Sequence, residues 1–135
     1  MAFFDWKPSY SVKVQSCDKD HQKLISLIND LYEAMKGGQG AQLVQQAVLE
    51  LEQYTRFHFS SEEALMAKAS YPALAAHRAE HENFVQKVSQ FRKDLANGPT
   101  GQAALISMFL KDWLTNHILR TDQQYSDHLN AKGIC

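Results

Sequence analysis

The sequence predicts an all-α protein: an up-down-up-down antiparallel four-helix bundle with an extended N-terminal arm. Four long segments repeat apolar residues at steps of three or four, the spacing that places side chains on one face of a helix. Glycine and proline separate these segments at three places, residues 37–40, 70–72 and 97–101. Because these connections are short, each helix is expected to run antiparallel to the one before it.

The first helix is expected to begin at about Asp18, because aspartate is a favoured N-cap residue. Its inward face carries His21, Leu24, Ile28, Leu31 and Met35. The second helix is expected from about Ala41 to Ala69, with an inward face formed by Val44, Val48, Leu51, Thr55, His58, Glu62 and Leu65. Such stripes are typical of amphipathic helices packed around a shared core.

The third helix keeps a regular inward stripe through Leu74, His77, His81, Phe84, Val88, Phe91 and Leu95. The fourth is expected from about Gln102 to Asn130, with Ile106, Leu110, Leu114, His117 and Thr121 facing inward. Residues 1–17 form the arm, in which Pro8 and the alternating Tyr10, Val12 and Val14 favour extended backbone, with Phe3, Phe4 and Trp6 as anchors. Residues 1–135 are thus expected to form a single domain, with the bundle at about 18–130.

Composition excludes several classes of function. The 14 Lys and Arg nearly balance the 15 Asp and Glu, and no basic tract is present, so a nucleic-acid partner is not expected. The apolar runs are far shorter than the roughly 20 residues that span a bilayer, and the N-terminus lacks the order of a signal peptide. We therefore expect a cytoplasmic protein without a membrane partner. Cys17 and Cys135 have no ligand-like spacing and are not expected to bind metal.

Five of the six histidines and two carboxylates form an ordered set with ligand-like spacing: His21, His58, Glu62, His77, His81, His117 and Asp122. The histidines and Glu62 lie on the inward stripes, and burying an unpaired polar group costs about 2 to 7 kcal/mol. Seven donors are too many for one ion, so the set predicts a site for two metal ions. Imidazole with carboxylate and no thiolate suits iron, manganese, zinc or copper, and argues against calcium or magnesium.

One spacing in this set is unusual. His117 and Asp122 are five residues apart, which turns an ideal helix by about 140° past a full turn. Two explanations remain open at this point. Either a local π-type bulge brings the two side chains together, or they reach different ions from different sides.

Together these residues resemble the hemerythrin family, specifically the bacterial single-domain bacteriohemerythrins. The resemblance covers nearly the whole chain. It rests on Phe4-Asp5-Trp6 with Tyr10, on Asp18-Lys19-Asp20-His21 with Leu24, on His58-Phe59-Ser60-Ser61-Glu62-Glu63 with Met66, on His77-Arg78-Ala79-Glu80-His81, and on Trp113-Leu114-Thr115-Asn116-His117-Ile118 with Asp122 and Tyr125. All seven family ligand positions are filled, in order and at the family's spacings.

The resemblance implies two iron ions with a bridging oxo or hydroxo group, and reversible dioxygen binding without enzymatic activity. It implies that His77, His81 and His117 bind one iron, that His21 and His58 bind the other, and that Glu62 and Asp122 bridge them. The second iron keeps the open position. Around it the matching apolar residues, expected to line a dry oxygen pocket, are Leu24, Phe59, Trp113 and Leu114. An oxygen-consuming recipient protein is the expected partner, and the chain is expected to be a monomer or weak homo-oligomer.

Other functions remain to be weighed against carriage, storage or delivery of oxygen. The same site could serve an oxygen, redox or nitric-oxide sensor, or show weak peroxidase or iron-oxidising activity. The run from His77 to His81 also matches the H-x-x-E-H zinc-peptidase motif, with Glu80 as general base, although that leaves the other donors unexplained. Glu63 and Glu80 are expected to be surface residues or to support the ligands, and His128 is expected to face solvent at a helix end.

Overall fold

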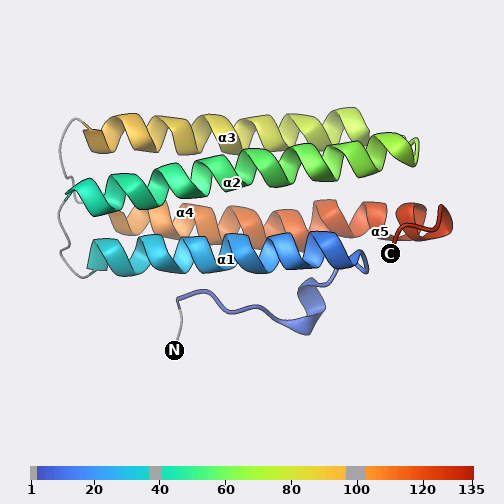
Figure 1. The fold of residues 1–135 in the computed structure, drawn as a ribbon, viewed down its shortest axis with the longest axis horizontal. Helices are drawn as coiled ribbons and strands as arrows, with labels where there is room; N and C mark the ends of the chain where they lie inside the picture. Colours follow the sequence, from blue (N-terminus) through green and yellow to red (C-terminus); the bar gives the residue numbers. More distant parts are fainter. Residues whose placement is uncertain (1–2, 37–40, 97–102) are drawn as a thin grey trace.

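The computed structural model describes residues 3–36, 41–96 and 103–135. Four long helices, α1 (Gln15–Lys36), α2 (Ala41–Lys68), α3 (Leu74–Ala96) and α4 (Ala103–Asn116), alternate in direction along the long axis of the molecule (Figure 1). The fourth continues through a π-helix, η2 (His117–Asp122), into α5 (Gln123–Ala131). The antiparallel four-helix bundle is therefore confirmed, while the expected turns at residues 37–40 and 97–101 lie outside the described residues.

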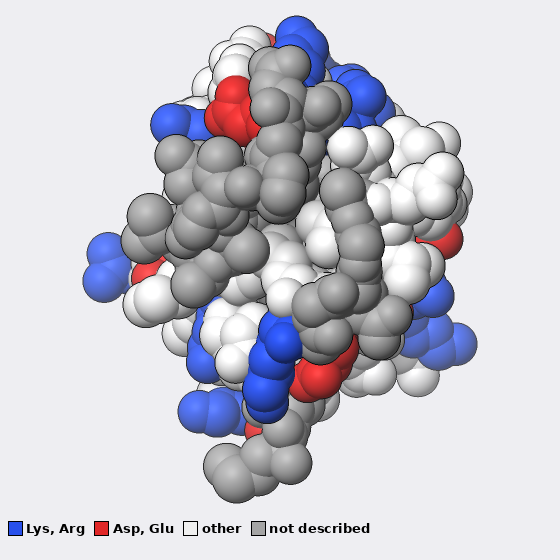
Figure 2. Space-filling model, turned by 90° about the vertical axis from the view of Figure 1, so that its left-hand side faces the viewer, with Lys and Arg blue, Asp and Glu red and all other residues white. Residues whose placement is uncertain are grey.

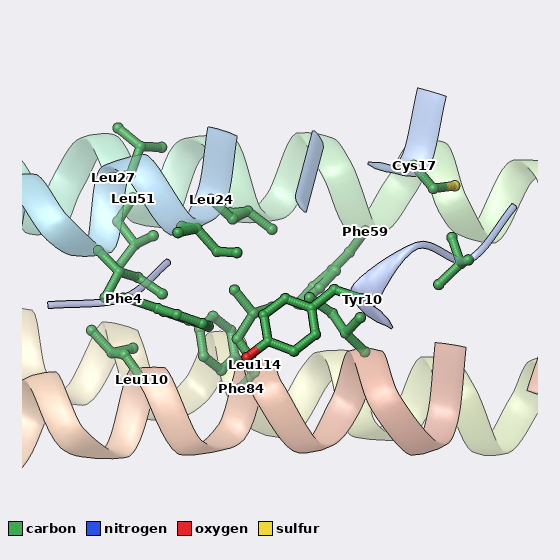
Figure 3. Packing of buried hydrophobic residues seen from close by; sticks show 14 of the residues in the cluster. Phe4, Tyr10, Cys17, Leu24, Leu27, Leu51, Phe59, Phe84, Leu110 and Leu114 are labelled. Atoms are coloured by element: carbon green, nitrogen blue, oxygen red, sulfur yellow. The ribbon is translucent and has the colours of Figure 1, made fainter. Parts of the chain in front are cut away.

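The helices pack in a ring around one core. Helix α1 contacts α2 and α4, and α2 contacts α3. Aromatic pairs close the ring between α3 and α4, where the rings of Phe84 and Trp113 lie 4.3 Å apart and those of Phe91 and Phe109 lie 5.6 Å apart. Figure 3 shows buried side chains from all four helices, Leu24, Leu51, Phe84 and Leu114 among those labelled, gathered in the space between them. Among the residues that the structure describes, no helix is both long and apolar enough to cross a membrane.

Helix α1 begins at Gln15, three residues before the expected start at Asp18. The reason is that the Asp18 carboxylate does not cap the helix end. It instead accepts hydrogen bonds from the backbone N–H of Val12 at 2.8 Å and from the Ser11 hydroxyl at 2.6 Å. Asp18 thus lies within the first turn of the helix and fixes the end of the arm against it.

The N-terminal arm runs along the bundle beside α1 (Figure 1). It contains one short 3-10 helix, η1 (Pro8–Tyr10). The backbone N–H and carbonyl of Phe4 are both paired with the Asn29 side-chain amide at 2.8 Å, and the buried Phe4 ring enters the core. The Phe3 ring stacks on Tyr32 with centroids 4.2 Å apart. These contacts hold the arm against the helices, so its aromatic residues act as the anchors that the sequence predicted.

Charged side chains are mixed over the surface. Figure 2 views the end of the bundle where α1 and α3 finish, and it shows basic and acidic side chains interspersed around the rim without a broad area of either sign. The chain as a whole has a net charge of −1.

Candidate metal centre

The structure brings all seven donors from the sequence into one buried cluster between the helices. We call it the seven-donor cluster, and its members are His21 from α1, His58 and Glu62 from α2, His77 and His81 from α3, and His117 and Asp122 from η2. Every member has an exposed fraction of 3% or less. Two groups within it have the arrangement of metal sites, one of five donors and one of three, and Glu62 belongs to both.

The two carboxylates form the centre of this cluster. Glu62 Oε1 lies 3.0 Å from His77 Nε2 and 3.1 Å from His81 Nε2, while Glu62 Oε2 lies 3.3 Å from His21 Nε2 and 3.2 Å from His58 Nε2. One carboxylate oxygen therefore faces the histidines of α3 and the other faces those of α1 and α2. This division is the geometry that a carboxylate needs in order to bridge two ions.

The two oxygens of Asp122 likewise face different histidines. Its Oδ1 lies 2.9 Å from His77 Nε2 and 3.0 Å from His117 Nε2, and its Oδ2 lies 3.2 Å from His21 Nε2. These separations match those of neighbouring ligands around an octahedral ion: bonds of about 2.1 Å at right angles place the ligand atoms ~3.0 Å apart. The donors thus already surround spaces of metal size.

The outer nitrogens of three histidines are held by carboxylates at the rim of the bundle. His58 Nδ1 lies 2.9 Å from Asp20 Oδ2, His81 Nδ1 lies 2.8 Å from Glu63 Oε2, and His117 Nδ1 lies 3.1 Å from Glu80 Oε1. A carboxylate there accepts the Nδ1 proton, and this fixes the tautomer in which Nε2 presents a lone pair to the cluster.

That tautomer leaves two lone pairs facing each other. His81 Nε2 and His117 Nε2 are 3.1 Å apart, and the Nδ1 atoms of both rings face carboxylates. A cation bound by the two nitrogens would relieve this repulsion. Further buried atoms of the cluster, among them both oxygens of Asp122 and Nε2 of His58, have no hydrogen-bond partner. Buried polar atoms without partners are rare in proteins, and coordination to metal would satisfy these.

Electrostatics favour the ionised carboxylates that a metal requires. Burial favours the protonated acid of Glu62, but His58 and His21 outweigh it and hold its pKa well below the ordinary value. Burial and the neighbouring Glu62 carboxylate favour the protonated acid of Asp122. His117 and His21 outweigh them and hold the pKa of Asp122 below its ordinary value. Burial also lowers the pKa of His21, yet the two carboxylates raise it to about 10. A proton on His21 therefore balances part of the carboxylate charge when no metal is bound.

The spacing of five between His117 and Asp122 is explained by the backbone. These two residues bound the π-helix η2, in which hydrogen bonds join residues five apart, and His117 Nε2 comes within 3.0 Å of Asp122 Oδ1. Of the two explanations left open, the π-type bulge is the one that the structure contains. The wider turn places both donors on the inward face of the helix.

Two supporting residues were assigned no role from the sequence. The hydroxyl of the fully buried Tyr125 donates to Glu62 Oε2 at 2.9 Å, and Asp20 accepts from His58 and, at 3.0 Å, from the Tyr54 hydroxyl. Although partial burial favours the protonated acid, His58 and Tyr54 hold the pKa of Asp20 below its usual value. Each residue lies on a different helix from its partner, so spacing along the chain gave no signal for the pairing.

The four residues expected to line an oxygen pocket lie beside the cluster. Leu24, Phe59 and Leu114 are buried, and Figure 3 shows them projecting from α1, α2 and α4 into the interior. The Phe59 ring stacks on His81 with centroids 3.7 Å apart, and the half-buried Trp113 stacks on His117 at 4.5 Å. Apolar surface therefore covers the imidazoles, while the pocket role itself remains a prediction.

Three residues outside the cluster have other surroundings. His128 was expected to face solvent, which is wrong: it is half-buried, and its Nε2 pairs with the Ala69 carbonyl oxygen at 2.7 Å. Glu80, the general base that a zinc peptidase would need, is engaged by His117 Nδ1 and by the Thr121 hydroxyl at 2.9 Å. Cys17 is buried, and burial with nearby Glu62 raises the pKa of its thiol.

Comparisons with known proteins agree with this geometry. The family model described as hemerythrin HHE cation binding domain matches residues 12–129. A bacteriohemerythrin of Stenotrophomonas maltophilia is 35% identical over 97% of this chain and 84% of its own length, and one of Methylococcus capsulatus is 30% identical over 97% of this chain and 100% of its own. A crystal structure of wild-type hemerythrin superposes with a TM-score of 0.86 at 28% identity, covering 95% of this chain and 98% of the other.

Proposed function

The chain belongs to the hemerythrin family, and from that premise we propose that it binds dioxygen reversibly at a non-haem di-iron centre, for oxygen carriage, storage or delivery. The observation that carries the proposal is the seven-donor cluster. Each of its two carboxylates has one oxygen near His77 and the other near His21. The cluster also contains more imidazoles than carboxylates. A pair of iron ions is the occupant that we infer.

The proposed ligand assignment follows the division of the two carboxylates. His77, His81 and His117 would hold one iron, and His21 with His58 would hold the other. Glu62 and Asp122 would bridge both, together with an oxo or hydroxo group. The side with two histidines has one protein donor fewer than the side with three, so an open position for dioxygen belongs there.

When bound, the two irons supply the electrons that pass to dioxygen on binding and return on its release. The protein holds the donors in place and controls water and protons around them. Tyr125 keeps its hydroxyl proton directed at Glu62 Oε2, and burial with Glu62 and Asp122 raises the pKa of this phenol well above its ordinary value. We propose that Leu24, Phe59, Trp113 and Leu114 exclude water from the open side, which favours release of dioxygen over irreversible oxidation of the irons.

An oxygen or redox sensor is the second candidate for the same site. The cluster is compatible with both roles, because sensing requires the same iron ligands and differs only in the steps after binding. The relatives that the chain matches over 84% and 100% of their own lengths are named bacteriohemerythrins, a name that fits both roles. An absorption spectrum of the reduced protein under argon, then air, then argon again separates the two. A visible band that appears with oxygen and disappears on its removal supports carriage, whereas irreversible bleaching contradicts it.

The composition of the centre has its own test. We expect two irons per chain by elemental analysis, because seven protein donors exceed the shell of one ion. One zinc per chain would contradict the di-iron proposal. Anaerobic reduction, followed by titration with oxygen and analysis for hydrogen peroxide, then shows whether oxygen is bound intact or consumed.

The pocket is tested by replacing Leu114 with asparagine. Leu114 lies one turn from His117 and is 2% exposed, so a polar amide there would draw water to the site. We expect faster conversion to the diferric form with iron retained. Leu110→Asn is the matched control, because Leu110 is 1% exposed on the same stripe but one turn farther away. Both changes should lower stability by similar amounts, and equal oxidation rates would show that Leu114 serves packing alone.

A further inference from the structure

The histidines on the two sides of the seven-donor cluster have unequal support from outside it. On the side with three histidines, two glutamates each hold the Nδ1 atom of one imidazole. On the side with two, His58 Nδ1 lies 2.9 Å from Asp20 Oδ2, whereas the buried Nδ1 of His21 has no hydrogen-bond partner. Among the described residues, Asp20 is therefore the one carboxylate that holds an outer nitrogen on the side proposed to stay open to dioxygen.

Asp20 has a second partner, the hydroxyl of Tyr54. Tyr54 lies four residues before His58, so both side chains occupy one face of α2. The phenol donates to Asp20 Oδ1 at 3.0 Å, and the imidazole donates to the other oxygen of the same carboxylate. Burial and the hydrogen bond to Asp20 raise the pKa of Tyr54 to about 12, so the phenol keeps its proton at neutral pH. Each oxygen of Asp20 thus has one donor from α2.

The two hydrogen bonds to Asp20 draw on the same negative charge. A carboxylate that accepts the Nδ1 proton makes an imidazole a better electron donor at its other nitrogen, and in His58 that nitrogen, Nε2, faces the cluster 3.2 Å from Glu62 Oε2. A phenol that donates to the carboxylate withdraws part of its charge and weakens this effect. Asp20 therefore raises, and Tyr54 lowers, the electron density that His58 offers to a bound metal ion.

We propose that Asp20 and Tyr54 are positioning residues that together set the redox potential of the di-iron centre through His58; this inference rests on the proposed function. Asp20 stabilises the ferric state by strengthening His58 as a ligand, and Tyr54 limits that stabilisation. A reversible carrier requires the limit, because the electrons that pass to dioxygen on binding must return to the irons on its release. When the ferric state is too stable, the electrons stay on the oxygen and the centre is left diferric.

Two substitutions should move this potential in opposite directions. Tyr54→Phe removes the hydroxyl and keeps the ring, whose centroid lies 5.7 Å from that of Phe57. It should lower the midpoint potential for the two-electron reduction of the diferric form to the diferrous form. Asp20→Asn removes the charge but keeps an oxygen that can accept from His58, so it should raise the same potential. A purely structural loss at the site would instead shift both variants in one direction, and that result would overturn the proposal.

The double variant tests whether Tyr54 acts through Asp20. Once the carboxylate charge is gone, the phenol has none to withdraw, so adding Tyr54→Phe to Asp20→Asn should leave the potential where Asp20→Asn alone puts it. Tyr32→Phe is the matched control, because it removes another half-buried phenol of which the ring stacks on Phe3. It should leave the potential unchanged. Additive shifts in the double variant, or equal shifts in Tyr54→Phe and Tyr32→Phe, would contradict the assignment.

A second measurement needs neither iron nor oxygen. In zinc-loaded protein, which is diamagnetic, the NMR signal of the His58 Nδ1 proton should move downfield in Tyr54→Phe, because its hydrogen bond to Asp20 strengthens. It should move upfield in Asp20→Asn, where the acceptor is neutral. An unmoved signal, or movement in one direction in both variants, would overturn the role of the pair even if the protein holds iron and binds oxygen. Failure of the proposed function appears differently, as protein without two irons or without a reversible oxygen band.

Discussion

Replacing Tyr125 with phenylalanine removes one hydroxyl from the inner surface of the metal centre. The Tyr125 hydroxyl donates to Glu62 Oε2 at 2.9 Å, and both residues are 0% exposed. Water cannot replace the lost donor without entering the core. A hydrogen bond to a charged group contributes about 1.5 to 3 kcal/mol, and we expect metal-depleted protein to lose about that much unfolding free energy.

The ring contacts of Tyr125 should survive this change, because phenylalanine has the same ring. They include a tilted contact with His77 at 5.6 Å and an edge contact with Tyr71 at 6.5 Å. The effect therefore isolates the hydroxyl. Thermal unfolding should shift down by roughly 3 to 5 °C per kcal/mol for a domain of this size. Iron affinity should fall about 10- to 100-fold, as is typical when the partner of a ligand is removed.

Tyr71→Phe is the control for this prediction. Tyr71 packs against Tyr125, but among the described residues its hydroxyl makes no hydrogen bond to the cluster. Urea unfolding of metal-depleted protein and competition with a chelator measure the two expected effects. If both variants lose the same stability and the same iron affinity, the hydrogen bond to Glu62 contributes nothing specific and the reasoning is refuted.

Two further predictions concern pH and the N-terminal arm. The pKa of His21 is raised to about 10 and that of His77 to about 9. Their protonated forms therefore stabilise the folded protein fully below the pKa of about 6.5 that histidine has in the unfolded chain. This stabilisation is lost as the pH rises through 9 to 10. Metal-depleted protein should thus melt at lower temperature at pH 10 than at pH 7, and iron-loaded protein should show a smaller difference. Asp18→Ala should speed amide hydrogen exchange at Val12 and lower the unfolding free energy by about 1.5 to 3 kcal/mol for each lost hydrogen bond. The control is Asp30→Ala on the exposed side of α1, which should change neither quantity.

The fold could be predicted because one simple signal runs through the whole chain. Stripes with a helical period predicted four helices, and their limits agree with the structure to within a few residues. The start of α1 was missed because an aspartate near a helix start is usually a cap. Here Asp18 pairs with the backbone of Val12 in the arm, a contact that depends on how the arm folds back.

The donors of the centre were visible for the same reason, because polar residues on an apolar stripe require partners in the core. The residues that support them were harder to find. Glu63 and Glu80 lie one residue off their inward stripes, and their acceptance of Nδ1 protons from His81 and His117 depends on the register between helices. A supporting role had been expected for both glutamates, whereas His128 was misjudged, since its partner, the Ala69 carbonyl, lies at the end of another helix. Spacing along one helix carries no information about such pairs.

The surroundings of the cluster differ between its rim and its interior, and this difference has a functional consequence. At the rim, Glu63 and Glu80 have side chains that are 19% and 47% exposed, and they hold the outer nitrogens of two imidazoles. Toward the middle of the bundle, Leu24 and Leu114 are each 2% exposed. Charges and protons can therefore exchange with solvent at the rim, while a small neutral molecule is favoured in the apolar interior. The proposed reversible binding of oxygen would require this separation, because protons that reached the proposed oxygen side would promote irreversible oxidation of the irons.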